Sequence, residues 1–194
     1  MNDPWSILEP GDRFTITSYS GRKYEATFIK AGPDEAGLYV RLANKKLARF
    51  SPGRLIWTSL EKASQGEILF AGDDVLVQAK NGEHVGKLAE PPAGRITITT
   101  PALKTVSIPL EDVVPGSFRL LFPASDLRAG DELLVRSTSG REYRGHAIAV
   151  LPERITARLA SGEQVAIRVE HLDLRSLHVL IPLDLPAVPS GGGP

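Results

Sequence analysis

The stretch GDRFTITSYSG, residues 11–21, decides the fold, because it returns as GDDVLVQAKNG at residues 72–82 and as GDELLVRSTSG at residues 130–140. In each copy a Gly-Asp pair is followed by alternating apolar residues and then by a second glycine. Alternation with a period of two is typical of a half-buried strand, and the second glycine is typical of a tight turn with positive φ. The repeat therefore predicts three hairpins, spaced about 60 residues apart.

Each hairpin presents one apolar face to a predicted core. The inward positions are Phe14, Ile16, Val75, Val77, Leu133 and Val135, and the opposite face carries Thr15, Leu76 and Leu134. Second strands are expected through residues 24–29 and 143–150, third strands near 38–42, 96–98 and 155–159, and fourth and fifth strands at 106–110 with 118–122 and at 165–169 with 177–181. Tyr39 and Arg41 are expected on the outward side of the first copy's third strand. Five short strands in about 60 residues predict an all-β protein of three tandem five-stranded barrels.

The succession of a Gly-Asp strand, a glycine turn, a meander, a fourth strand, a one-turn break and a final strand resembles the SH3-like, Tudor-like and Sm-like small β-barrels. The segment IPLEDVV, residues 108–114, is also similar to the final barrel of bacterial ribosome maturation factors. The resemblance implies the fold and not a function. The acidic and aromatic loop signature of signalling SH3 domains is missing, and so is the Sm signature.

A likeness to the split barrels of cyclic-dinucleotide receptors rests on the RxxxR spacing of Arg154 and Arg158 alone. Because no DxSxxG segment follows them, we interpret both arginines as outward positions on a strand. The repeat places a first barrel at residues 1–66, a second at 67–123 and a third at 124–185, joined by short linkers at 61–67 and 123–127. Residues 186–194 contain three consecutive glycines, which predicts a disordered tail.

Composition excludes several classes of protein. The chain has no cysteine, which rules out disulfides, thiolate zinc sites and cysteine nucleophiles and indicates a reducing, cytoplasmic location. The N-terminus lacks a basic start followed by an apolar core, and no stretch approaches the roughly 20 apolar residues that cross a bilayer. We therefore expect neither secretion nor a membrane span.

No residues form a recognisable catalytic, cofactor-binding or metal-binding motif. The four histidines, at positions 84, 146, 171 and 178, lack the short spacing of metal ligands, and no HExxH, GxSxG or phosphate-binding glycine motif is present. Glu170, His171 and Asp173 could imitate an acid-base cluster, but a short charged turn is more simply a solvated corner. We expect a binding protein without enzymatic activity, without a cofactor and without a metal.

Charge and aromatic residues are concentrated in the first copy. Its residues 1–66 carry 10 Lys and Arg against 7 Asp and Glu, and eight of the chain's twelve aromatic residues, although the whole chain is neutral. Basic groups interleaved with aromatic rings suit single-stranded nucleic acid, and exposed aromatic residues on a small barrel suit peptides equally well. The candidate contact residues are Arg22, Lys23, Tyr39, Arg41, Lys45, Lys46, Arg49 and Arg54.

Two hypotheses for the partner therefore stay open. The first is an adaptor that engages protein partners, which is favoured by net neutrality and by repeated binding folds. The second is an RNA- or single-stranded-DNA-binding protein that acts through the first barrel. Against both stands the simpler interpretation that Phe14, Phe28 and Trp57 belong to the core and that Lys45 with Lys46 is a charged turn.

Overall fold

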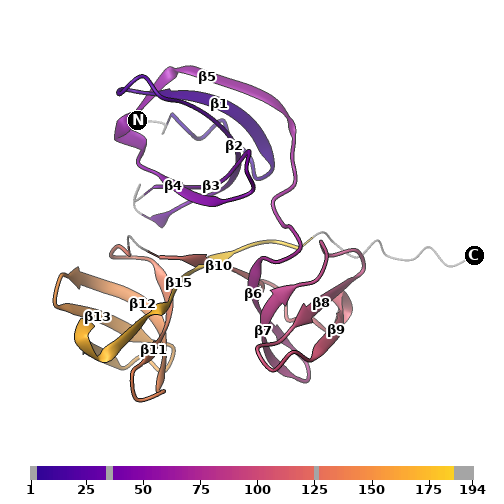
Figure 1. The fold of residues 1–194 in the computed structure, drawn as a ribbon, viewed down its shortest axis with the longest axis vertical. Coiled ribbons are helices and arrows are strands. Elements are labelled where there is room, and N and C mark those ends of the chain that lie inside the picture. The colour runs from indigo at the N-terminus through magenta and orange to yellow at the C-terminus, as the bar shows by residue number, and fades with distance from the viewer. Residues whose placement is uncertain (1–3, 34–36, 125–126, 186–194) are drawn as a thin grey trace, which may run out of the picture. The chain divides into compact units, whose positions relative to one another are not determined.

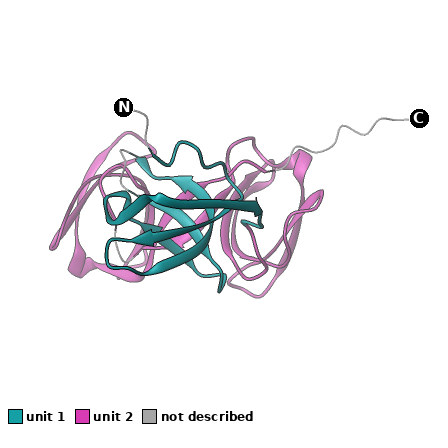
Figure 2. Ribbon diagram, turned by 90° about the horizontal axis from the view of Figure 1, so that it is seen from above, with its two compact units in different colours: residues 1–68 teal, residues 69–194 magenta. Residues whose placement is uncertain are grey.

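A computed structural model describes residues 4–33, 37–124 and 127–185, in which strands and one-turn 3₁₀ helices are the regular elements. The all-β class predicted from the sequence is confirmed. In this part of the chain no helix has the length and apolar character needed to span a membrane. The tail predicted at residues 186–194 lies outside the described residues. The chain divides into two compact units, unit 1 (residues 1–68) and unit 2 (residues 69–194), coloured teal and magenta in Figure 2.

Unit 1 contains one five-stranded antiparallel sheet with the strand order β4-β3-β2-β1-β5 (Figure 1). Its strands are β1 (Asp12–Ser18), β2 (Lys23–Ala31), β3 (Leu38–Leu42), β4 (Leu47–Phe50) and β5 (Leu55–Gln65), with a 3₁₀ turn at Pro52–Arg54 before β5. The strand β1 pairs with β2 on one side and with β5 on the other. The linker predicted at residues 61–67 was wrong over 61–65, because β5 continues to Gln65 and pairs there with Asp12.

Unit 2 contains two more copies of this strand order, joined in one ten-stranded sheet. One copy consists of β6 (Asp74–Ala79), β7 (Gly82–Leu88), β8 (Arg95–Thr99), β9 (Thr105–Pro109) and β10 (Arg119–Pro123). The other consists of β11 (Glu132–Ser137), β12 (Glu142–Leu151), β13 (Arg154–Leu159), β14 (Gln164–Arg168) and β15 (Leu172–Pro182). We call strands β1–β5, β6–β10 and β11–β15 the first, second and third meander.

The second and third meanders are joined by antiparallel pairing of their last strands, β10 and β15, from Arg119↔Pro182 to Pro123↔His178. The sequence predicted three separate five-stranded barrels, whereas the chain has two sheets. In the described residues β4 and β5 are the edges of one sheet and β9 and β14 the edges of the other, so the strand pairings show no closed barrel. The repeat itself is confirmed as a strand order that occurs three times.

The Gly-Asp pair begins each meander for a local reason. The glycine has a positive φ of 93°, 90° or 89° at Gly11, Gly72 and Gly130, which L side chains rarely adopt. The carboxylate that follows accepts a backbone N–H three residues earlier at 2.8 Å, in the pairs Asp12 with Glu9, Asp73 with Phe70 and Asp131 with Arg128. This side-chain bond closes the turn that starts the first strand.

The core of unit 1 lies on the inward face that the sequence pattern predicts. Phe14 and Phe28 are buried in it, so their interpretation as core residues is confirmed. Trp57 is half-buried, packs against Trp5 at 5.6 Å between ring centroids and donates its indole N–H to the Pro52 carbonyl. This tilted contact between the two rings connects the segment before β1 with the start of β5.

Candidate functional site

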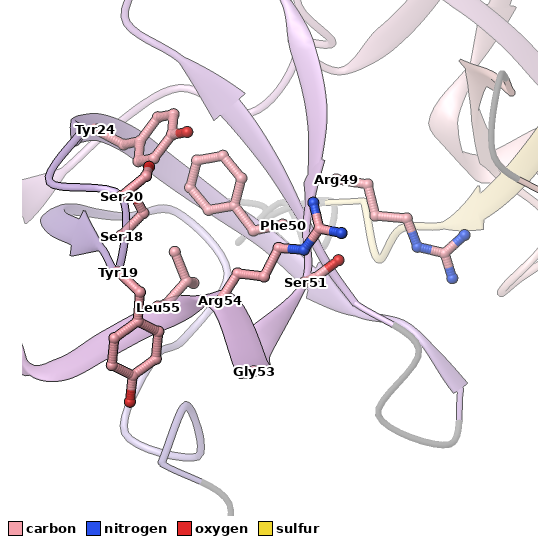
Figure 3. Close-up of a pocket in the computed structure, with 10 residues that line it drawn as sticks. All are labelled: Ser18, Tyr19, Ser20, Tyr24, Arg49, Phe50, Ser51, Gly53, Arg54 and Leu55. Carbon is pink, nitrogen blue, oxygen red and sulfur yellow. The ribbon is translucent and has the colours of Figure 1, made fainter.

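A pocket of about 520 Å³ opens in unit 1 at the end of the sheet where the turn between β1 and β2 meets the 3₁₀ turn before β5. Figure 3 shows its lining side chains, which are Ser18, Tyr19, Ser20, Tyr24, Arg49, Phe50, Ser51, Gly53, Arg54 and Leu55. A volume of this size is within the range of small-ligand and side-chain sites. None of the ten residues is a carboxylate, a histidine or a lysine.

The turn between β1 and β2 forms one wall of the pocket. Hydrogen bonds within the turn stabilise its conformation. The Ser18 N–H donates to the Arg22 carbonyl at 2.9 Å, and the hydroxyls of Ser18 and Ser20 lie 2.8 Å apart. Gly21 takes a φ of 81° at the tip. The Tyr19 N–H donates to the Arg54 carbonyl at 3.0 Å, which fixes this wall against the 3₁₀ turn.

Aromatic rings make the apolar part of the pocket. Tyr24 and Phe50 contact each other with centroids 4.8 Å apart and planes at 53°, and the Arg22 guanidinium lies 5.1 Å above the Tyr24 ring. Phe50 is buried, whereas Tyr19 is 73% exposed. In Figure 3 the Tyr24 and Phe50 rings lie together on one side of Arg54 and Tyr19 points the other way. The pocket therefore has an ordered aromatic wall and an exposed aromatic rim.

Arg54 supplies the pocket's available charge. Its side chain is exposed and makes no hydrogen bond or ion pair with the residues that the structure describes. Arg49 also lines the pocket, and its guanidinium lies 5.0 Å from the centroid of the Tyr39 ring. A guanidinium beside apolar rings offers charge-assisted hydrogen bonds to an anion whose remaining part is apolar.

Three of the eight candidate residues lie at or beside this pocket, since Arg49 and Arg54 line it and Arg22 covers the ring of Tyr24. Lys23 is exposed at the start of β2 and is not among the lining residues. Lys45 and Lys46 are exposed in the turn between β3 and β4, at the other end of β4 from Phe50. The pair is thus a charged turn separate from the pocket.

The outward, exposed placement predicted for Tyr39 and Arg41 was wrong, because each is only 3% exposed. The chain that leaves β5 contacts Arg41, whose Nε and Nη2 atoms donate to the Ile68 carbonyl at 3.1 and 2.6 Å and whose Nη1 atom donates to the Lys45 carbonyl. The Arg49 guanidinium lies over the ring of Tyr39. Alternation along a strand separates two faces but does not say which face is exposed. The sequence of β3 does not indicate that the segment at Ile68 contacts Arg41.

Sequence reasoning missed eight of the ten lining residues as members of a site, namely Ser18, Tyr19, Ser20, Tyr24, Phe50, Ser51, Gly53 and Leu55. A usable signal was present, because residues 20–24, SGRKY, return as SGREY at residues 139–143. The structure shows the same turn there: the hydroxyls of Ser137 and Ser139 lie 2.9 Å apart, and the Arg141 guanidinium lies 5.0 Å above the Tyr143 ring. In the first and third meanders an arginine just before the second strand therefore places its guanidinium over a tyrosine two residues later.

No protein-family model matches the chain, and no curated protein sequence matches it. Among the described residues no group of three or more His, Cys, Asp or Glu side chains is placed to hold a metal ion. The geometry of the pocket therefore carries the functional argument.

Proposed function

We propose that this chain is a non-enzymatic binding protein whose first meander holds a segment of a protein partner in the pocket between the β1–β2 turn and the 3₁₀ turn. One observation carries the proposal: aromatic rings and the Arg54 guanidinium meet in a pocket whose ten lining residues include no carboxylate. Aromatic and arginine side chains are enriched at protein interfaces and dominate their binding energy.

We further propose that each meander is an SH3-like small barrel and that the protein acts in the cytoplasm. The strand order that recurs three times, with a 3₁₀ turn between the fourth and fifth strands of each meander, supports the barrel assignment. The absence of cysteine supports a reducing compartment. In this scheme the second and third meanders are a joined docking module.

Binding of RNA or single-stranded DNA by the first meander is the second candidate. The exposed ring of Tyr19 beside Arg54 favours it, since a base can stack on the ring while the guanidinium contacts a phosphate. Burial of Tyr39 and Arg41 counts against it, and so does the position of Lys45 and Lys46 at the far end of β4. A nucleic-acid strand that extends beyond the pocket would need these four side chains to form a continuous exposed surface with Tyr19 and Arg54.

Site-specific photo-crosslinking tests the proposal. A benzophenone amino acid replaces Tyr19 in the full chain, and a second variant carries it at the exposed, equivalent Thr138 of the third meander. We expect a protein adduct at position 19 in native lysate that resists nuclease, exceeds the signal at position 138 and disappears with Arg54→Glu. Equal labelling at the two positions would refute the proposal, and loss of the adduct after nuclease treatment would favour the nucleic-acid candidate.

A further inference from the structure

The geometry points to an acidic peptide segment as the ligand of this pocket, with a Glu or Asp carboxylate on Arg54 and a neighbouring apolar side chain against Tyr24 and Phe50. This inference rests on the proposed function, because it names the chemistry of the partner that the first meander would hold.

The third meander shows what a carboxylate does at the equivalent position. Its 3₁₀ turn, Val169–His171, corresponds to Pro52–Arg54, so Glu170 stands where unit 1 has Gly53 and His171 where it has Arg54. The backbone anchors correspond as well, since the Thr138 N–H donates to the His171 carbonyl at 2.9 Å as the Tyr19 N–H does to that of Arg54. The two turns are therefore comparable residue by residue.

In the third meander a carboxylate of the chain itself lies beside Arg168 and His171. An Oε1 atom of Glu170 is 3.4 Å from an Arg168 guanidinium nitrogen and 3.6 Å from the His171 ring nitrogen. In the first meander Gly53 supplies no carboxylate, and the Arg54 guanidinium has no ion pair in the described part of the chain. The first meander thus offers a position that an external carboxylate can occupy.

The apolar side of the pocket limits the ligand further. Phe50 and Leu55 are buried at the base and Tyr24 is half-buried, so an apolar side chain placed there would lose contact with water. A volume of about 520 Å³ holds one or two side chains, in contrast to the extended track that several nucleotides need. Charge and shape together favour a short acidic segment with an apolar residue beside the carboxylate.

The decisive variant supplies the missing carboxylate from within. A Cβ at Gly53 would meet no atom within 4 Å, and the glycine does not use positive φ, so a longer side chain fits. Gly53→Glu places a carboxylate where Glu170 lies in the third meander, and it should compete with the ligand for Arg54. Gly53→Gln has the same size without the charge and is the matched control.

Fluorescence anisotropy of the full chain measures the effect. The probes are a labelled peptide GSELEFESG, its amide counterpart GSQLQFQSG and a short labelled oligothymidylate. We expect the glutamate peptide to bind about tenfold more tightly than the glutamine peptide, and Gly53→Glu and Arg54→Gln each to weaken it about tenfold, because charge-assisted hydrogen bonds are lost. Gly53→Gln adds the same bulk to the pocket without the charge, so it should weaken binding by a smaller factor than Gly53→Glu, and the difference between the two variants measures the effect of the carboxylate.

Equal binding of the two peptides, or equal loss with Gly53→Glu and Gly53→Gln, would overturn the inference. Tighter binding of oligothymidylate that also depends on Arg54 would overturn it in favour of a nucleic acid. Crosslinking at position 19 distinguishes failure of the acidic-ligand inference from failure of the protein-binding function. A nuclease-resistant adduct without a preference for glutamate leaves the protein-binding function in place and removes only the acidic ligand.

Discussion

Unit 1 and unit 2 use the same strand frame but differ on the outer face of the first strand. At the centre of β1 this face carries Thr15, which is half-buried and lies beside Glu61. The matching positions of β6 and β11 are Leu76 and Leu134, which form a buried cluster with Leu121 and Leu180. One position in the repeat thus separates a meander with a polar outer face from two meanders that share an apolar one.

The last strands of the meanders show the same contrast between polar and apolar residues. At the end of β5, Glu61, Lys62 and Ala63 are exposed, and β5 is an edge strand in the described sheet. The aligned residues of β15 are His178, Val179 and Leu180, which pair with β10 and are largely buried. Charged side chains on an edge strand discourage pairing with another strand, whereas an apolar edge invites it. The same frame therefore gives a separate sheet or a joined one according to a few outward residues.

A change at Leu134 should have the largest effect on this comparison. Leu134→Thr gives the third meander the residue that β1 has, and loss of the buried side chain should lower the free energy of unfolding of unit 2 by about 3 kcal/mol. Both tryptophans, Trp5 and Trp57, lie in unit 1, so their fluorescence reports that unit while circular dichroism reports both. We expect the dichroism transition in urea to shift and the tryptophan transition to stay.

The reciprocal change is the control. Thr15→Leu should alter the tryptophan transition by no more than about 0.5 kcal/mol, because Thr15 lies beside Glu61 and the leucine cluster belongs to unit 2.

Hydrogen exchange shows which strands Leu134→Thr destabilises, and we expect faster exchange in β10 and β15. Unchanged exchange in those strands would show that the leucine cluster does not hold the joined sheet together.

The Asp12 carboxylate gives a smaller, pH-dependent effect in unit 1. It is buried and contacts Lys62 Nζ at 2.6 Å, the Glu9 N–H and the Gln65 amide, and in β15 the residue aligned with Lys62 is Val179. The hydrogen bond with Lys62 and then the one from Glu9 lower the pKa of Asp12 below its ordinary value. The folded state therefore binds this proton less readily than the unfolded chain does.

A lowered folded-state pKa means that the stabilisation is complete above the unfolded pKa of about 3.9 and is lost as the pH falls through the folded value. Asp12→Asn should lower the free energy of unfolding by about 1–2 kcal/mol at neutral pH, measured by tryptophan fluorescence in urea. The difference from the wild-type chain should shrink below about pH 4. A difference that stays constant down to pH 2 would contradict the role of the carboxylate charge.

Local chemistry made much of the fold predictable. The Gly-Asp pairs predicted where the first strand of each meander begins. The alternation of apolar residues predicted that Phe14, Val75 and Leu133 face the core, and they are buried. The pattern could not predict which segment packs against the strand face opposite the core. Leu76 and Leu134 were apolar on the face opposite the core, which was a signal of the joined sheet, but period-two reasoning treats that face as solvent.

The site was predictable in composition more than in position. Arg22, Arg49 and Arg54 were identified from charge in an aromatic-rich copy, and the structure brings them to one end of the sheet. Arg41 was misplaced because its guanidinium is held by the Ile68 carbonyl, which is distant in sequence, and Tyr39 because the Arg49 guanidinium lies over its ring. Such long-range contacts depend on tertiary structure, which single-strand periodicity does not encode.

The smallest expected effect tests whether the third meander can acquire the site of the first. With the first site disabled by Arg54→Gln, the pair Glu170→Gly and His171→Arg removes the internal carboxylate and adds the guanidinium. We expect the glutamate peptide to regain binding, about threefold to tenfold weaker than in the wild-type chain, because Ile167 stands where Phe50 supplies a ring. His171→Arg alone keeps Glu170 and should regain none. Equal anisotropy titrations of these two variants would mean that the internal carboxylate is not what distinguishes the meanders.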